Sequence, residues 1–356
     1  MVTEIKKIIY LPAIWITVLL FILLNCFMIY NKFHSYENLD NIYRLIIDQT
    51  LDQKIINQYI PMYDNLDMMN ILEVKQDMYD YHPSGDFQSF IESNYQKLQQ
   101  RVEEIKDSKE SDQLFYPGDY YRLHTFLYKN IMSYLIIEIL ILTLVSVLYV
   151  MDFERLKQTQ EIVYSSKIGK KIQRKKVMSG LLVGIIIGAF LMVVTLSYYF
   201  ATVSYQGLWD VSVSSAMASV PRGVLYYPLI TFFKLSNLQY LLITIALSFI
   251  LIFITVLMVV GIQLLLNNSY LSFLASMLLL LVFYYVSTFQ TESWIDIILA
   301  MNPTMFWYYC GGWLIENEIH LSFNGFEVLS LSVQSLVITI ILWICYKRYL
   351  HQDIKC

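Results

Sequence analysis

The stretch from Asp152 to Lys176 reads DFERLKQTQEIVYSSKIGKKIQRKK and separates two long apolar runs, residues 131–151 and 177–200. Eight of its 25 residues are Lys or Arg. Each flanking run is long enough to cross a bilayer, whose hydrocarbon core requires about 20 apolar residues in a helix. We therefore interpret the stretch as a polar loop that joins two membrane spans.

The composition is that of an integral membrane protein. Of the 356 residues, 57% are hydrophobic and 15% are charged, whereas about a quarter of the residues in a typical soluble domain are charged. The net charge of −4 gives no reason to expect a nucleic-acid partner. The four cysteines and five histidines lack the spacing of a disulfide framework or a metal site, so we expect no bound metal.

Six apolar runs predict six membrane-spanning helices. Besides the two runs that flank the loop, one lies in residues 1–30, two form an antiparallel hairpin in 240–289, and the last is 328–346. No cleavage site follows the first run, so we expect it to be retained. The remaining polar segments are residues 31–130, 201–239, 290–327 and a tail, 347–356.

Residues 31–130 are acidic, with 17 Asp or Glu against 10 Lys or Arg. Their apolar residues recur at helical spacing, as at Phe87, Ile91 and Leu98, and do not alternate as in a strand. The predicted fold class is an all-α polytopic membrane protein, with six transmembrane helices and a helical extracellular domain between spans one and two. The acidic, aromatic character of this domain suits a cationic peptide as a ligand.

The distribution of positive charge predicts the orientation in the membrane. The first seven residues, the 152–176 loop and the tail hold 13 of the 25 Lys and Arg residues. Cytoplasmic loops are enriched in these residues, so we expect both termini and the loop to be cytoplasmic and residues 31–130 to be outside. We expect a multi-pass protein of a cell membrane, the plasma membrane of a bacterium.

The 152–176 loop has a helix, break, helix pattern. Apolar residues at helical spacing from Phe153 to Tyr164 predict a short amphipathic helix. Ser165 and Ser166 then break it and offer a cap to a second helix that leads into the third span. A simpler interpretation is that the basic residues only contact anionic lipid head groups, which explains the charge but not the helical pattern.

At these residues the chain resembles the type-2 permeases of ATP-binding-cassette (ABC) exporters. In that family an acidic residue, a small break and a basic pair precede a lysine at the mouth of the third span. They form the coupling helix, which docks in a groove of the ATPase. The resemblance assigns ATPase coupling to Glu154, Glu161, Tyr164, Ser165, Ser166, Gly169, Lys170, Lys171 and Lys176. Lys167 departs from the pattern, because many members carry proline there.

The resemblance extends to the six spans, the cytoplasmic termini and the broken segment at Asn302-Pro303-Thr304. It leaves out residues 31–130, whose counterpart is small in many members. It implies a non-catalytic permease subunit that moves an amphipathic or hydrophobic substrate, whether peptide, lipid or drug. It also implies two kinds of protein partner, ABC ATPase subunits and a second permease, which is either another copy of this chain or a different one.

The chain has no phosphate-binding loop of the form G-x-x-x-x-G-K-[ST]. The nearest match places Tyr164 at the first glycine and Lys171 at the Ser/Thr position. We therefore expect no cofactor to bind directly, and expect ATP and Mg to be bound by the partner ATPase. Membrane lipid is the remaining expected partner.

Two features lie within the spans. Glu138 is an ionisable residue deep in an apolar run, where charge is costly. It is a candidate for the substrate path, or alternatively a carboxyl that is hydrogen-bonded to a neighbouring span.

Gly180, Gly184 and Gly188 repeat every four residues and predict close helix packing, within the bundle or between two permeases.

A different class of function also fits the sequence. In this alternative the protein is a membrane sensor or mechanotransmitter, whose outer helical domain binds a ligand without transport. The broken outer segment favours an exporter, whereas the long domain between the first two spans favours the sensor.

Overall fold

The computed structural model describes residues 2–37, 63–111, 113, 124–165, 169, 172–203, 205, 207–215, 219–222 and 225–351. In this part of the chain six helices are long and apolar enough to cross a membrane. They are α2 (Pro12–Glu37), η2 (Thr125–Met132) continued by α8 (Ser133–Leu156), α10 (Ile172–Thr202), α11 (Asn237–Leu266), α12 (Ser269–Ser287) and α15 (Phe326–His351). The protein is thus a multi-pass helical membrane protein.

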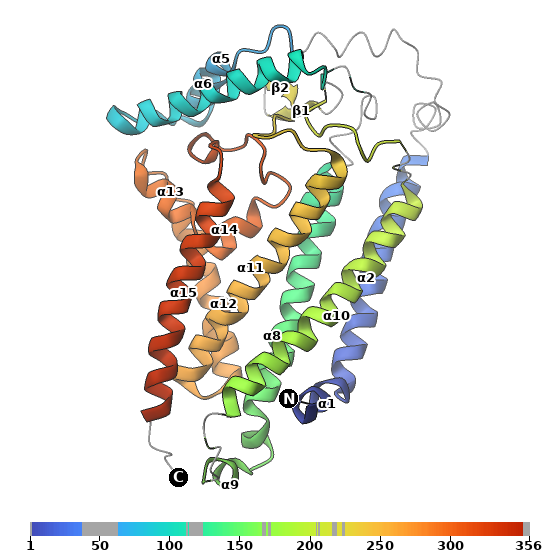
Figure 1. The fold of residues 1–356 in the computed structure, drawn as a ribbon, viewed down its shortest axis with the longest axis vertical. Coiled ribbons are helices and arrows are strands. Elements are labelled where there is room, and N and C mark those ends of the chain that lie inside the picture. The colour runs from blue at the N-terminus through green and yellow to red at the C-terminus, as the bar shows by residue number, and fades with distance from the viewer. Residues whose placement is uncertain are drawn as a thin grey trace.

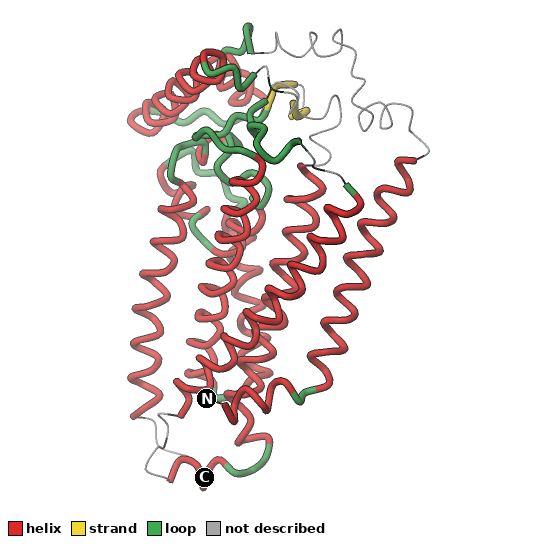
Figure 2. The backbone as a smooth tube through the Cα atoms, turned by 45° about the vertical axis from the view of Figure 1, so that its right-hand side comes forward, coloured by secondary structure: helices red, strands yellow, loops and turns green. Residues whose placement is uncertain are grey.

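The six helices form a bundle with different structures at its two ends (Figure 1). At one end lie α1 (Val2–Ile9), the short helix α9 (Gln160–Ser165) and the end of α15. The opposite end carries a layer of helices, loops and a strand pair (Figure 2). We call these the α9 end and the outer layer.

Two helix boundaries differ from those predicted. Residues 1–30 contain two helices, because α1 ends at Ile9 and α2 begins at Pro12. Proline lacks the N–H that a preceding turn would need, but it is well suited to the first position of a helix. The second span, predicted as 131–151, runs from Thr125 to Leu156, so α8 includes the first residues of the 152–176 loop.

Helices α8 and α10 pack against each other along the centre of the bundle, with α2 against α10 and α11 against α8. Three glycines of α10 lie on the contact line. A Cβ atom built on Gly180 would lie 2.7 Å from the Cα of Val147, and one on Gly184 would lie 2.6 Å from the Cα of Thr143. Gly188 faces Ile139 in the same way. The two backbones are therefore closer than any other residue type would allow.

The other spans pack around α11. Helices α12 and α15 both contact it. A tight turn joins α11 to α12, in which Asn267 adopts a left-handed conformation (φ 50°) and the side chain of Asn268 caps α12 by accepting from the N–H groups of Tyr270 and Leu271. Helices α12 and α15 bury a smaller share of their residues than α8 does, so they form the outside of the bundle.

The outer layer is built from three segments, not from residues 31–130 alone. The first segment, residues 31–130, supplies α5 (Met68–Tyr79) and α6 (Gly85–Asp107), while residues 38–62 and 114–123 lie outside the described part. The second segment, residues 201–239, supplies the antiparallel strands β1 (Ser219–Arg222) and β2 (Leu225–Pro228). The third segment, residues 290–327, supplies α13 (Trp294–Ala300), α14 (Pro303–Tyr308) and η4 (Ile319–Leu321).

A common hydrophobic core joins these segments. Tyr95, Leu98 and Val102 of α6 pack in one cluster with Ile230 and Ile319. The described residues of the outer layer thus include a β-hairpin in the 201–239 segment, which the sequence analysis did not predict. Because each segment contributes to the same core, we expect the outer layer to fold as one unit on the bundle.

Buried ion pairs also hold the outer layer together. Glu316 is fully buried and pairs with Lys75 of α5. The hydroxyls of Tyr95 and Tyr227 donate to the same carboxylate at 3.1 and 2.8 Å. A buried carboxylate with a matched cation and further donors avoids the cost of an isolated charge.

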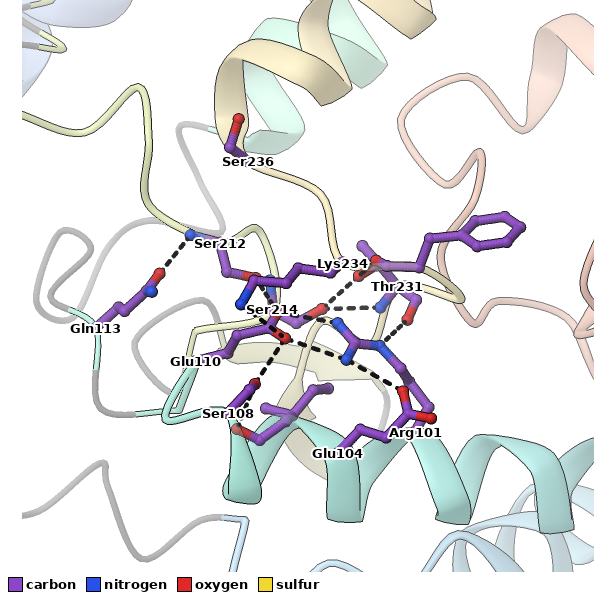
Figure 3. Close-up of polar contacts among 12 residues, drawn as sticks. Arg101, Glu104, Ser108, Glu110, Gln113, Ser212, Ser214, Thr231, Lys234 and Ser236 are labelled. Atoms are coloured by element: carbon purple, nitrogen blue, oxygen red, sulfur yellow. Dashed lines mark hydrogen bonds and ion pairs between the residues drawn. The ribbon is translucent and has the colours of Figure 1, made fainter.

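A second buried pair joins the end of α6 to the 201–239 segment (Figure 3). The guanidinium of Arg101 donates to both oxygens of Glu110, at 3.1 and 2.9 Å, and the hydroxyl of Ser212 donates to Glu110 at 2.7 Å. Burial alone would raise the pKa of Glu110, but hydrogen bonds from Arg101, Ser212 and Ser108 outweigh it and hold this pKa below its ordinary value. The carboxylate is thus ionised at neutral pH.

The α8–α10 contact predicts how the bundle responds to a single methyl group. Gly184→Ala forces two backbones apart, and overpacking of this kind costs about 1–3 kcal/mol, so we expect a lower thermal unfolding midpoint of the purified chain in detergent. Gly261→Ala on α11 is the matched control, because its Cβ would lie 3.6 Å from the nearest atom, an ordinary contact. An equal midpoint for the two variants would contradict the close packing.

Candidate functional site

The 152–176 loop projects from the α9 end of the bundle. The chain leaves α8 at Leu156 and turns at Gln158, which adopts a left-handed conformation (φ 55°). The N–H of Thr159 donates to the carbonyl of Glu154 at 2.9 Å and closes the turn. Helix α9 follows and lies beyond the ends of the long helices (Figure 1), and α10 begins at Ile172.

Two apolar side chains are exposed at and just before helix α9. Ile162 is 72% exposed, and Leu156, at the end of α8, is 52% exposed. Glu161 is also exposed, in the first turn of α9. Single exposed apolar residues are common on protein surfaces, so docking of a partner on α9 stays a prediction.

Several residues assigned to coupling lie outside the described part of the chain. These are Ser166, Lys170 and Lys171, while for Tyr164 and Ser165 the structure describes the backbone of α9 but not the side chains. Gly169 is described and has a φ of 49°, a conformation that favours glycine. The role of the basic pair in docking therefore stays a prediction.

Glu154 and Lys176, which the resemblance also assigns to coupling, are buried and paired with each other. Lys176 is fully buried and Glu154 is 5% exposed. The ammonium of Lys176 pairs with one oxygen of Glu154 and lies 3.4 Å from the carbonyl oxygen of Met151. Their side chains therefore connect the end of α8 to the start of α10 and present no surface to a partner.

The N-terminal helix α1 joins the same cluster. The ammonium of Lys7 lies 3.3 Å from the other oxygen of Glu154 and 2.8 Å from Glu4. It also lies 4.2 Å from the centroid of the Phe153 ring. We call Glu4, Lys7, Glu154 and Lys176 the inner charge cluster. It has two negative and two positive groups, so the buried charges balance.

A second set of contacts ties α8 to the α11–α12 turn. Arg155 pairs with Asp152 at 2.6 Å and donates to the carbonyl of Asn267 at 2.8 Å. The hydroxyl of Ser269 donates to the carbonyl of Leu148 at 3.1 Å. Through these contacts and the inner charge cluster, the base of the loop is therefore connected to α1, α8 and α10 and to the turn of the α11–α12 hairpin.

Glu138 lies in a smaller polar cluster in the middle of the bundle. The amide of Asn25 on α2 donates to the carboxyl of Glu138 at 2.7 Å and to the hydroxyl of Thr195 on α10 at 3.3 Å. All three side chains are buried, and the amide oxygen of Asn25 has no hydrogen-bond partner among the described residues. The cluster links α2, α8 and α10, so Glu138 has a packing role whether or not a substrate passes it.

Within the described ranges no group of three or more His, Cys, Asp or Glu residues is placed to hold a metal ion. The α9 end combines a short helix with buried ion pairs that join α1, α8 and α10. Sequence reasoning missed Glu4 and Asn25, and treated Lys7 only as a topology signal. The Glu4-x-x-Lys7 spacing was the one local sign of an ion pair.

In comparisons with protein-family models, curated proteins and solved structures, nothing matches the chain significantly.

The inner charge cluster predicts an unequal effect of removing each member of the central pair. Glu154→Gln leaves the ammonium of Lys176 buried without its carboxylate, a loss that typically costs about 3–5 kcal/mol. Lys176→Met costs less, because Glu154 keeps Lys7 as a partner. We expect the thermal unfolding midpoint to fall most in Glu154→Gln and to recover partly in the Glu154→Gln/Lys176→Met double variant.

Lys175→Met serves as the control, because Lys175 is the exposed neighbour of Lys176, and we expect its midpoint to match the unmodified chain. A double variant that is less stable than Glu154→Gln alone would show that the two side chains do not compensate each other.

Proposed function

We propose that this chain is the permease subunit of an ATP-driven exporter, and that a separate ATPase subunit docks on α9. The observation that carries the proposal is the position of α9, which projects from the bundle between two helices that pack without an intervening side chain. A force on such a helix moves both of its neighbours. The resemblance of the loop to the coupling helix of type-2 ABC permeases supports the same assignment.

The proposed movement separates α8 and α10 from the α11, α12 and α15 group. The glycine contact and the inner charge cluster keep α8, α10 and α1 together. By contrast, α10 and α11 meet only over a short stretch, so the movement would have to loosen or slide the contact of α8 with α11 and with the α11–α12 turn. ATP-driven closure of two ATPase subunits would thus rock one group against the other and open alternate sides of the membrane.

A cavity at the α9 end lies where the two groups part. It has a volume of about 380 Å³ and lies between Val177 and Met178 of α10, Leu264 of α11 and Leu342 of α15. Its wall is apolar, while Arg174 lies at its polar edge. Such a cavity suits an amphipathic or hydrophobic substrate that enters sideways from the membrane.

The assembly in this proposal comprises two permeases and two ATPases in a cell membrane. The excess of Lys and Arg at the α9 end favours a cytoplasmic position for this end and an outside position for the outer layer. The outward direction of transport is taken from the resemblance to exporters. The permease itself performs no chemistry, and ATP and Mg belong to the partner. Glu138 remains the candidate for a polar contact with the substrate within the membrane.

The test is recovery of the ATPase from native membranes. We expect a tagged chain, extracted in mild detergent, to bring down an ATP-hydrolysing protein that mass spectrometry identifies. Ile162→Asp places a charge at the centre of the proposed docking surface, and the loss of one central apolar contact typically costs about 2 kcal/mol or more. We therefore expect recovery of the ATPase to fall by about tenfold or more.

Tyr79→Asp is the matched control, because Tyr79 is a 47% exposed aromatic residue of α5 at the opposite end. Its recovery of ATPase should equal that of the unmodified chain. Recovery of the folded chain with no ATP-hydrolysing partner would contradict the proposal and favour the sensor.

A further inference from the structure

A pocket of about 180 Å³ lies where α12 meets the outer layer. The end of α12 and the start of the following loop form one side, with Tyr284 and Phe289. Tyr308 and Tyr309, at the end of α14, form another side. Its volume suits a small functional group, such as an amine with its substituents, rather than a whole amphiphile.

A buried carboxylate lies in the wall of this pocket. Asp296 of α13 is 4% exposed. One of its oxygens accepts from the N–H and the hydroxyl of Thr291, at 2.8 and 2.6 Å, and the other accepts from the hydroxyl of Tyr81 at 2.8 Å. All of these donors are neutral, so they orient the carboxylate without balancing its charge.

The lack of a counter-charge distinguishes Asp296 from Glu110 and Glu316. Glu327, in the first turn of α15, is also buried without an ion-pair partner among the described residues, but it does not line the pocket. Glu110 pairs with Arg101 and Glu316 pairs with Lys75. Among the described residues no Lys or Arg lies within ion-pair distance of Asp296. A buried charge without a partner is costly, and the open space beside it has room for a cation.

The protonation states near the pocket keep its charge negative. Burial alone would raise the pKa of Asp296, but the hydrogen bonds from Thr291 and Tyr81 outweigh it and hold this pKa below its ordinary value. Burial lowers the pKa of His320, which also lines the pocket, to about 4, so this ring is neutral at pH 7. Glu318 adds a second carboxyl group to the lining.

The aromatic rings add a second preference for cations. The ring centroids of Tyr284 and Tyr308 are 6.0 Å apart, and those of Tyr308 and Tyr309 are 5.3 Å apart. Tyrosine faces attract ammonium and guanidinium groups by their quadrupole. Lys129, which does not line the pocket, lies 6.0 Å from the centroid of the Tyr308 ring, so this ring already has one cation near it.

We propose that this pocket binds the organic ammonium group of a cationic amphiphile, with Asp296 as the counter-charge and Tyr284 and Tyr308 as aromatic walls. Its place at the outer end of α12 leaves the apolar part of the ligand in the outer half of the membrane. Identification of cationic amphiphiles as the transported class rests on the proposed function, whereas binding at the pocket does not.

The test is isothermal titration calorimetry on the full chain in a neutral maltoside detergent. Four probes of equal chain length isolate the charge: hexylammonium, hexyltrimethylammonium, hexanol and hexanesulfonate. We expect saturable binding of one or both cations, at one site per chain, and none of the neutral or anionic probes. Preference for hexylammonium indicates a lysine-like amine, and preference for hexyltrimethylammonium indicates a choline-like head group.

Variants link the binding to the pocket. Asp296→Asn removes the charge at nearly constant shape, and we expect about tenfold weaker binding of the cation. Asp86→Asn neutralises an exposed carboxylate on α6 and should change nothing. Tyr284→Leu, at a 41% exposed residue, should weaken binding several-fold, whereas Tyr284→Phe keeps the ring and the affinity.

Equal binding of the sulfonate, or unchanged binding in both Asp296→Asn and Tyr284→Leu, would overturn the proposal. If Asp296→Asn fails to fold, the comparison of Tyr284→Leu with Tyr284→Phe is sufficient to test the proposal. Because no ATPase takes part, a negative result leaves the exporter proposal standing. Conversely, cation binding in a chain that recovers no ATPase would leave the pocket as the ligand site of a sensor.

Discussion

The close contact between α8 and α10 is the constraint on which the rest of the bundle depends. At Gly180 and Gly184 the two backbones meet without a side chain between them, so neither helix slides or tilts without the other. At the α9 end the same two helices are joined by the buried pair of Glu154 and Lys176. The loop between them is therefore fixed at both of its ends to one rigid unit.

This arrangement changes the role of the acidic and basic residues in the 152–176 loop. The resemblance treats them together as a docking surface, but the structure divides them. Glu154 and Lys176 hold the helices together from inside, and α1 joins them through Lys7. Within the described part of the loop, α9 exposes Ile162 and Glu161, and this is the surface that we propose for a partner.

Buried carboxylates of the outer layer differ in whether a cation balances them. Glu110 and Glu316 each have a buried cation as partner. Lys75 and Glu316 are far apart in the sequence, whereas Arg101 and Glu110 are nine positions apart and the hydroxyl of Ser212 makes the distant contact to Glu110. Asp296 has only neutral donors among the described residues. Asp296 also lines a pocket, which is why we propose it as the counter-charge of a cationic ligand.

The sequence alone was sufficient for the number and order of the spans, because about 20 consecutive apolar residues have few alternatives to a membrane helix. The glycine repeat likewise indicated a close contact, but not that α8 is the partner. Glu154 could not be placed, since α8 continues past residue 151 to Leu156 and turns this side chain inward. The shared core of the outer layer joins residues more than a hundred positions apart, such as Tyr95 and Ile319, and such contacts leave no local pattern.

Distances between spin labels on the chain, in complex with the ATPase that we propose as its partner, test most directly whether α8 and α10 move as one. Exposed positions for the labels, in a chain whose native cysteines are replaced, are Val145 on α8, Met178 on α10 and Ile344 on α15. We expect the distance between Val145 and Met178 to stay constant on addition of ATP, and the distance between Met178 and Ile344 to change. A change between Val145 and Met178 as large as that between Met178 and Ile344 would contradict a rigid α8–α10 unit.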